Sequence, residues 1–147
     1  MTQTLRAPGL LLGAGLGGFV DGIVLHQILQ WHHMLTGVRS PDTVAGLRMN
    51  TLADGLFHVA AWLLVLGGIA LLYSRVTRDR REAWRSRELW GWALAGWGLF
   101  NLVEGLVDHQ ILGVHHVREG AGHLPWDLAF LALGALLVGA GWAVRRR

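Results

Sequence analysis

Four apolar stretches, each long enough to cross a lipid bilayer, divide this chain of 147 residues. A membrane-spanning helix needs about 20 predominantly apolar residues. The stretches cover residues 8–31, 52–73, 89–114 and 125–144. The helices of a soluble bundle would each keep a polar face, but residues 62–73 and 128–144 contain no polar side chain that could form one. The sequence therefore predicts an all-α, multi-pass protein, a four-helix transmembrane bundle that forms a single membrane domain over residues 1–147.

One motif occurs twice within the apolar sequence. Residues 21–33 read DGIVLHQILQWHH, and residues 104–116, which lie 83 positions later (104 − 21), read EGLVDHQILGVHH. Eight of these thirteen positions are identical, and the first pairs Asp21 with Glu104, which indicates an internal duplication. The predicted units are repeat one at 8–73, a basic cytoplasmic loop at 74–87 and repeat two at 88–144. Both repeats would start on the same side, as parallel repeats related by an axis along the membrane normal.

The arginines are distributed unevenly along the chain. All thirteen basic residues are arginine, and ten of them precede the first apolar stretch, lie between the second and third, or follow the fourth. An excess of basic residues marks cytoplasmic connections, so we expect both termini in the cytoplasm and the chain in the inner (cytoplasmic) membrane. Membrane topology and contact with the lipid bilayer explain the arginine clusters and therefore the basic character of the chain, so no nucleic-acid partner is needed.

Ionisable residues recur inside the predicted helices, where they are costly and are therefore candidates for function. At about 1.5 Å per residue, they lie at matched depths in the outer half of the membrane. The chain has no cysteine, and imidazole with carboxylate suits Zn, Fe or Mn, with Cu as a further candidate. The candidate metal ligands are Asp21, His26, Asp54, His58, Glu104, His109 and Asp127. Gln27 and Gln110 are expected to orient them, in a centre of one or two ions open to the extracytoplasmic side.

Two histidine pairs end the two copies of the motif. We expect the first helix to continue to about Met34 and the third to about Val114, which places both pairs at outer helix ends within reach of water. With one further histidine they are candidates for loading metal into the deeper site: His32, His33, His115, His116 and His123.

Three other readings of the same residues remain open. A haem could lie between two helices with His26 and His109 as axial ligands. The carboxylates and histidines could form a proton or cation pathway. They could also be hydrogen bonds that hold the helices together, each contributing about 1 kcal/mol. The sequence does not decide whether the protein is an enzyme.

The motif also carries a resemblance to a known family. Asp21-Gly22-x-x-x-His26-Gln27, its copy at residues 104–110, and Asp54-Gly55-x-x-His58 resemble small bacterial membrane proteins known as domain of unknown function 2243. The likeness covers nearly the whole chain and implies a four-helix membrane fold with no established activity. Members look associated with a cytochrome oxidase assembly factor, which implies copper or haem handling and a respiratory oxidase assembly partner. The chain lacks the Met and Cys clusters of Cu(I) carriers, which argues against a Cu(I) chaperone. A homo-oligomer is a further candidate assembly.

Overall fold

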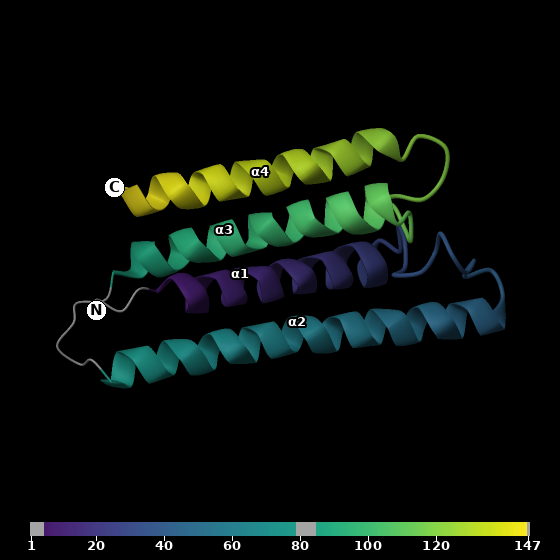
Figure 1. The fold of residues 1–147 in the computed structure, drawn as a ribbon. Helices are drawn as coiled ribbons and strands as arrows, with labels where there is room; N and C mark the ends of the chain where they lie inside the picture. The colour runs from purple at the N-terminus through teal and green to yellow at the C-terminus, as the bar shows by residue number, and fades with distance from the viewer. Residues whose placement is uncertain (1–4, 79–84, 147) are drawn as a thin grey trace.

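The computed structural model describes residues 5–78 and 85–146, in which all regular structure is helical. The four long helices are α1 (Arg6–Val20), α2 (Val44–Arg78), α3 (Ser86–Glu104) and α4 (Leu124–Arg146) (Figure 1). Two π-helical segments, η1 (Asp21–Ile28) and η2 (Gly105–Ile111), continue α1 and α3 without a break. The prediction of an all-α fold with four long helices is confirmed.

Three of the helical segments are long and apolar enough to cross a membrane. They are Arg6–Ile28, Val44–Arg78 and Leu124–Arg146. The segment formed by α3 and η2 is not among them, because its glycines and tryptophans, together with Asn101 and Glu104, lower its mean hydropathy. Polar residues in this segment are buried inside the bundle instead, so its composition reflects an interior position.

The helices lie side by side in the order α2, α1, α3, α4 (Figure 1). The helix pairs that pack on each other are α1 with α2, α1 with α3, and α3 with α4. Of the most apolar part of each of these three segments, 44% is buried in Arg6–Ile28, against 11% in Val44–Arg78 and 17% in Leu124–Arg146. The pair α1 and α3 is therefore the centre of the bundle, and the two outer helices present broad apolar surfaces to their surroundings.

Glycines allow α1 and α3 to approach each other closely. A Cβ atom at Gly13 would overlap the backbone carbonyl of Ala93, and one at Gly96 would overlap the backbone carbonyl of Leu10. Small residues at a helix crossing permit this contact between backbones in membranes. The two contacts are counterparts under the 83-residue offset (96 − 13 and 93 − 10), which is the reciprocal pattern expected when two related halves pack on each other.

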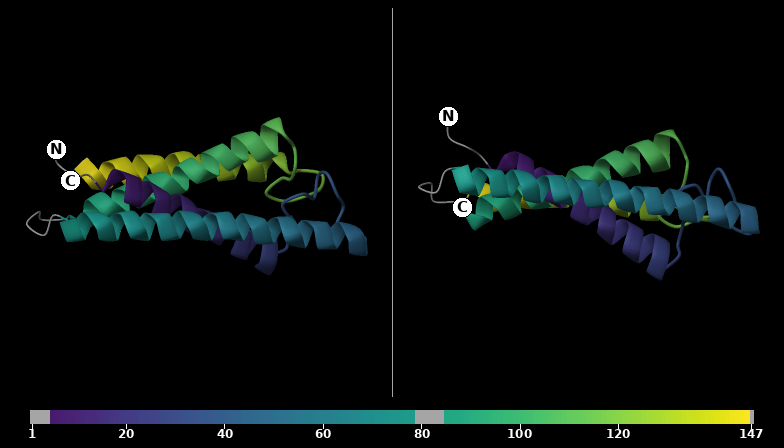
Figure 2. Two further views of the ribbon diagram at one scale, coloured as in Figure 1. Left: turned by 60° about the horizontal axis from the view of Figure 1, so that its bottom comes forward. Right: turned by 90° about the horizontal axis from the view of Figure 1, so that it is seen from below.

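Towards the loop end of the bundle, α1 and α3 with their π-helical continuations splay apart (Figure 2). The segments after η1 and η2 fold back into this region and bond to each other. Gly37 N–H donates to the carbonyl of Val114 at 2.8 Å, and Glu119 N–H donates to the carbonyl of Trp31 at 3.2 Å. The loops of the two halves are therefore interlocked rather than separate.

The expectation that the first helix continues to about Met34 is wrong, as is the extension of the third to about Val114. The helices end at Ile28 and Ile111, and left-handed residues follow, Gln30 with φ 50° and Gly113 with φ 58°. A residue in this conformation commonly terminates a helix. The chain then reverses direction in both halves and returns towards the bundle interior.

Candidate metal centre

The first part of each motif copy is π-helical, over Asp21–Ile28 and Gly105–Ile111. Five residues of an α-helix turn by about 500°, which would leave an acid and a histidine five positions apart on different faces. A π-helix bonds residue i to residue i+5 and is frequent at functional sites. This geometry brings Asp21 Oδ2 to 3.1 Å from His26 Nε2, and Glu104 precedes His109 by the same five positions. The acid-to-histidine spacing of five, present in both copies, was the sequence signal for this local structure.

The chain reversal carries His32 and His115 into the interior. They are 2% and 0% exposed, so the prediction that these two residues lie at outer helix ends within reach of water is wrong. Their rings stack with centroids 4.6 Å apart. His26 lies 4.3 Å from His32, and His109 lies 4.8 Å from His115. These four rings form one continuous group, which we call the histidine cluster.

Each half contributes a triad of one carboxylate and two imidazoles to this region. The triads are Asp21, His26 and His32, and Glu104, His109 and His115. Within each triad one potential ligand atom per residue lies within 4.8 Å of the others, and all six residues are buried. The second triad follows the first at a constant offset of 83 residues. We call these six residues the buried centre.

Three of the four rings are held through Nδ1, which leaves Nε2 available to a further ligand. The hydrogen bonds run from His26 Nδ1 to Asp54 Oδ1 at 2.9 Å, from His32 Nδ1 to the Val117 carbonyl at 2.9 Å and from His115 Nδ1 to the Met34 carbonyl at 3.1 Å. The Nε2 atoms of His32 and His115 are buried and have no hydrogen-bond partner among the described residues, whereas that of His26 faces Asp21 Oδ2 at 3.1 Å. Metal-binding histidines typically donate their other N–H to a carboxylate or a backbone carbonyl. The ring orientations therefore fit a metal centre.

The carboxylates of the buried centre are also short of partners. Both carboxylate oxygens of Glu104 are buried without a hydrogen-bond donor in the part of the chain that the structure describes, and Asp21 Oδ2 faces His26 Nε2 at 3.1 Å. Each residue also borders a mainly apolar cavity, of about 250 Å³ beside Asp21 and about 430 Å³ beside Glu104. A buried carboxylate is strongly disfavoured unless it is paired or bound to a cation. A bound cation would therefore stabilise these oxygens, as it would the imidazole nitrogens of the buried centre.

Burial determines the protonation of the two loop histidines. It lowers the pKa of His32 to about 2, and the neighbouring imidazoles of His26 and His115 lower it further than burial alone would. Burial likewise lowers the pKa of His115, partly opposed by the hydrogen bond to Met34. A neutral imidazole is the form that binds metal, so both rings are ready to act as ligands at neutral pH.

Asp54 joins several segments of the first half. Its Oδ1 accepts from His26 and from the Met34 backbone N–H at 2.8 Å, and its Oδ2 accepts from His33 at 2.7 Å and from Gln27 at 3.5 Å. The carboxylate holds the Nδ1 side of His26, opposite the nitrogen that faces Asp21. Its position fits the orientation of a ligand better than direct ligation.

Asp127 has the same place in the second half. Its Oδ1 accepts from the Val117 backbone N–H at 3.0 Å and lies 3.6 Å from His109 Nδ1. Its Oδ2 accepts from Gln110 at 3.2 Å, so each of the predicted orienting glutamines contacts an aspartate and not a histidine. The two aspartates and two glutamines form a layer behind the buried centre.

His58 is not brought into either triad. Its Nδ1 lies 2.7 Å from the backbone carbonyl of Asp54, one turn earlier in α2, and its ring lies against Gly22. This contact satisfies the ring locally. Of the seven residues predicted as ligands, four belong to the triads of the buried centre, while Asp54 and Asp127 lie behind it.

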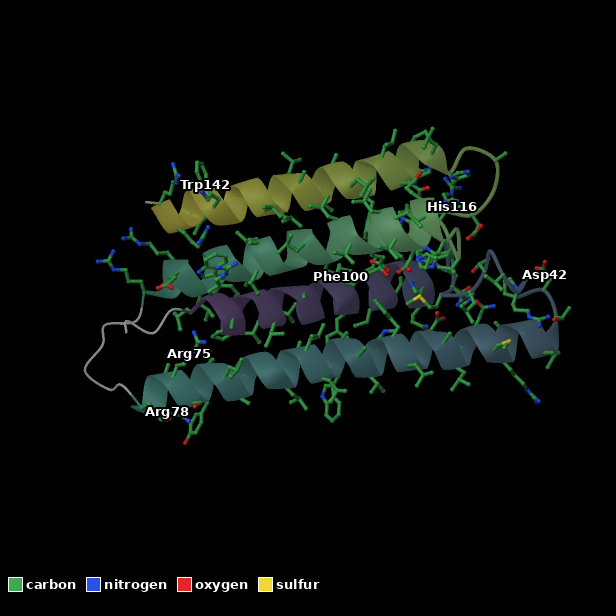
Figure 3. All side chains as sticks on the ribbon, viewed as in Figure 1. Asp42, Arg75, Arg78, Phe100, His116 and Trp142 are labelled. Carbon is green, nitrogen blue, oxygen red and sulfur yellow. The ribbon has the colours of Figure 1, made fainter. Side chains whose placement is uncertain are left out.

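A third group of potential ligands lies closer to the surface. His116, His123 and Asp127 bring their ligand atoms within 4.8 Å of one another, and we call them the outer site. Nitrogen- and oxygen-bearing side chains gather at this end of the bundle, where His116 is labelled in Figure 3. Asp127 thus belongs to the outer site and also faces the buried centre.

The fold and the site together define a helical membrane protein with an interior cluster of imidazoles and carboxylates that could hold metal. The sequence model of the family described as "Predicted membrane protein (DUF2243)" matches residues 8–147, and the chain belongs to this family. None of the curated proteins and none of the solved structures compared with the chain matches it.

Proposed function

We propose that this protein is an integral membrane metalloprotein whose buried centre holds one or two transition-metal ions. The observation that carries the proposal is the direction of the histidine nitrogens: three rings are anchored through Nδ1, while the buried Nε2 atoms of His32 and His115 have no partner among the described residues and that of His26 faces the carboxylate of Asp21. The buried carboxylate oxygens of Asp21 and Glu104 complete the donor set. Imidazole with carboxylate and no sulfur favours Zn, Fe or Mn, and Cu(II) is also compatible.

The residues divide into two roles in this proposal. The six residues of the buried centre bind the metal. Asp54 orients the imidazole of His26 through a hydrogen bond, Asp127 faces that of His109 at 3.6 Å, and the glutamines beside them hold the aspartates. A bound ion would supply Lewis-acid or redox chemistry, or would be cargo, and its identity decides between these.

A haem between His26 and His109 receives less support. In space, the rings of His32 and His115 lie one after the other between those two residues, and the successive ring centroids are 4.3, 4.6 and 4.8 Å apart. A haem would have to displace two buried imidazoles. A proton pathway across the bundle is also less well supported, because the α1–α3 contact beyond the centre is closed by the backbones at Gly13 and Gly96.

The orientation in the membrane follows from the arginine distribution. Both ends of the described chain lie at the end of the bundle opposite the buried centre (Figure 1). If that end is cytoplasmic, as expected from the basic residues, the centre faces the extracytoplasmic side of the inner membrane. Reporter fusions should place Arg147 on the cytoplasmic side and Thr43 on the extracytoplasmic side, and an extracytoplasmic Arg147 would contradict this orientation.

Metal analysis and an absorption spectrum of detergent-purified protein test the proposal. We expect one or two ions per chain, and loss of that metal in the His26→Ala, His109→Ala double variant. His58→Ala is the matched control, because His58 is a histidine of the bundle outside the triads and should leave the metal content unchanged. A Soret band would select haem. Metal-free protein whose melting temperature is unaffected by chelator and by added metal would leave hydrogen bonds between helices as the explanation.

A further inference from the structure

We propose that the outer site, formed by His116, His123 and Asp127, binds a divalent ion exchangeably and passes it to the buried centre. The passing role rests on the proposed metal centre, whereas the outer site rests on its own contacts. His116 Nδ1 lies 2.8 Å and His123 Nδ1 lies 3.2 Å from the same oxygen, Asp127 Oδ2. The two rings stack with centroids 3.7 Å apart, so three ligand atoms from two segments converge on one point.

The exposure of the three side chains changes across the site. Side-chain exposure is 40% for His123, 24% for His116 and 0% for Asp127. An ion held there would have protein on one side and solvent on the other. Three protein ligands with an open position are typical of sites that keep exchangeable ligands, and two imidazoles with one carboxylate suit Zn²⁺, Co²⁺, Ni²⁺ or Cu²⁺.

Local backbone structure positions His123 for this role. Gly120 and Gly122 have φ values of 108° and 100°, which glycine adopts readily and other residues rarely do. The turn leads directly into α4, where the His123 carbonyl accepts the backbone N–H groups of Trp126 and Asp127. His123 and Asp127, four residues apart, therefore lie on one face of the first helical turn.

The same carboxylate links the outer site to the buried centre. Asp127 Oδ2 belongs to the outer site, while Asp127 Oδ1 lies 3.6 Å from Nδ1 of His109 in the second triad. An ion at the outer site is thus separated from the buried centre by a single carboxylate group. This contact provides the route by which the ion is passed inward.

The first half lacks an equivalent outer site. His123 lies four residues before Asp127, and the residue four before Asp54 is Asn50. Asn50 is fully buried and already bonded: its Oδ1 accepts the Leu35 backbone N–H at 3.0 Å, and its Nδ2 donates to the Arg39 carbonyl at 2.7 Å. Loading through the second half alone follows from this difference, and the first half supplies the substitution that tests it.

The experiment compares His123→Asn with His33→Asn in full-length protein stripped of metal in detergent. His33 contacts Asp54 Oδ2 at 2.7 Å as His116 contacts Asp127 Oδ2, but the second imidazole on Asp54, that of His26, contacts the other oxygen. Zn²⁺ is added, and a chromophoric chelator then separates rapidly released from slowly released ions. Wild type and His33→Asn should show one rapidly exchanging ion. His123→Asn should lose this ion, since removing even an indirect ligand partner lowers metal affinity by about tenfold or more. Because the ion then no longer reaches the buried centre through the outer site, the slowly released ions should load at least about tenfold more slowly.

Unchanged rapid exchange and loading in His123→Asn would overturn the proposal, and equal losses in both variants would mark an adventitious surface ion only and overturn it as well. Glu104→Gln with His115→Ala separates this proposal from the proposed function. A rapid ion that persists there and still depends on His123 supports the outer site independently. If wild type holds that rapid ion but no slowly released one, the metal centre and the passing role both fail, and the exchangeable site alone stands.

Discussion

The two halves of the buried centre space their carboxylates and imidazoles differently. In the first half the separations are 3.1 Å from His26 Nε2 to Asp21 Oδ2 and 2.9 Å from His26 Nδ1 to Asp54 Oδ1. In the second half, Glu104 Oε1 lies 3.8 Å from Nε2 of His115, which is the counterpart of His32 and not of His26, and His109 Nδ1 lies 3.6 Å from Asp127 Oδ1. The side chains of the first half are close enough to pair with each other, and those of the second half are not.

This difference indicates how the halves would respond to an ion. Both oxygens of Glu104 and Nδ1 of His109 are buried without partners among the described residues. Leaving a buried polar group unsatisfied costs about 1–3 kcal/mol, and more for a charged one, so a cation would relieve more in the second half. The outer site also adjoins only this half. We therefore expect the second half to bind its ion more strongly than the first.

The largest effect is expected from removing the two rings that connect the halves. His32 and His115 stack at 4.6 Å in the middle of the histidine cluster, and each contributes to one triad. The double variant His32→Ala, His115→Ala should lose metal from both halves, with affinity reduced by more than about 100-fold, beyond the usual effect of an indirect partner. Metal content after equilibrium dialysis measures this, and a double variant with full metal content would exclude a centre shared by the two triads.

The next effect tests the inequality of the halves directly. Glu104→Gln should weaken metal binding more than Asp21→Asn, by about tenfold, because Glu104 has two unpaired oxygens and Asp21 has one close imidazole partner. Competition titration of the two variants against a chelator of known affinity gives the ratio. Equal losses would mean that the distances in the two halves do not set their affinities.

Acidification should destabilise the metal-free protein. The pKa of His32 is about 2 in the folded chain and about 6.5 in an unfolded one, so below pH 6.5 the unfolded state binds the extra proton. Stability is therefore present above pH 6.5 and falls as the pH is lowered, by up to about 1.4 kcal/mol per pH unit for this one ring. Melting temperatures between pH 7.5 and pH 5 should fall less steeply in His32→Gln, and identical slopes would assign the effect to other groups.

The smallest effect concerns the glutamines behind the centre. Gln110 lies 3.2 Å from Asp127 Oδ2, and Gln27 lies 3.5 Å from Asp54 Oδ2. Because each acts on the metal only through an aspartate and a histidine, Gln110→Ala should weaken binding by about tenfold or less, and Gln27→Ala by less still. Isothermal titration of the two variants measures the order, which a stronger effect of Gln27→Ala would reverse.

The sequence predicts the four helices because long apolar stretches leave little alternative, and it identifies the acids and histidines because they are exceptional in such stretches. The location of His32 and His115 was predicted incorrectly, since an unbroken helix was assumed where Gln30 adopts a left-handed conformation. Gly113 marked the same reversal in the second copy. Counted as an α-helix, positions 21 and 26 lie on different faces, and it is the π-helical turn that brings Asp21 to His26.

The two loop bonds of the histidine cluster have a consequence for mechanics. His32 Nδ1 donates to Val117 in the other half, and His115 Nδ1 donates to Met34, which is the reciprocal pair (32 + 83 and 117 − 83). Each ring thus links its own loop to the opposite loop through a hydrogen bond of one nitrogen, while its second nitrogen faces the centre. Two events that share a rigid ring are thermodynamically coupled, and the coupling is mutual. If a bound ion stabilises the two hydrogen bonds between the loops by a given free energy, breaking those bonds weakens the binding of the ion by the same free energy.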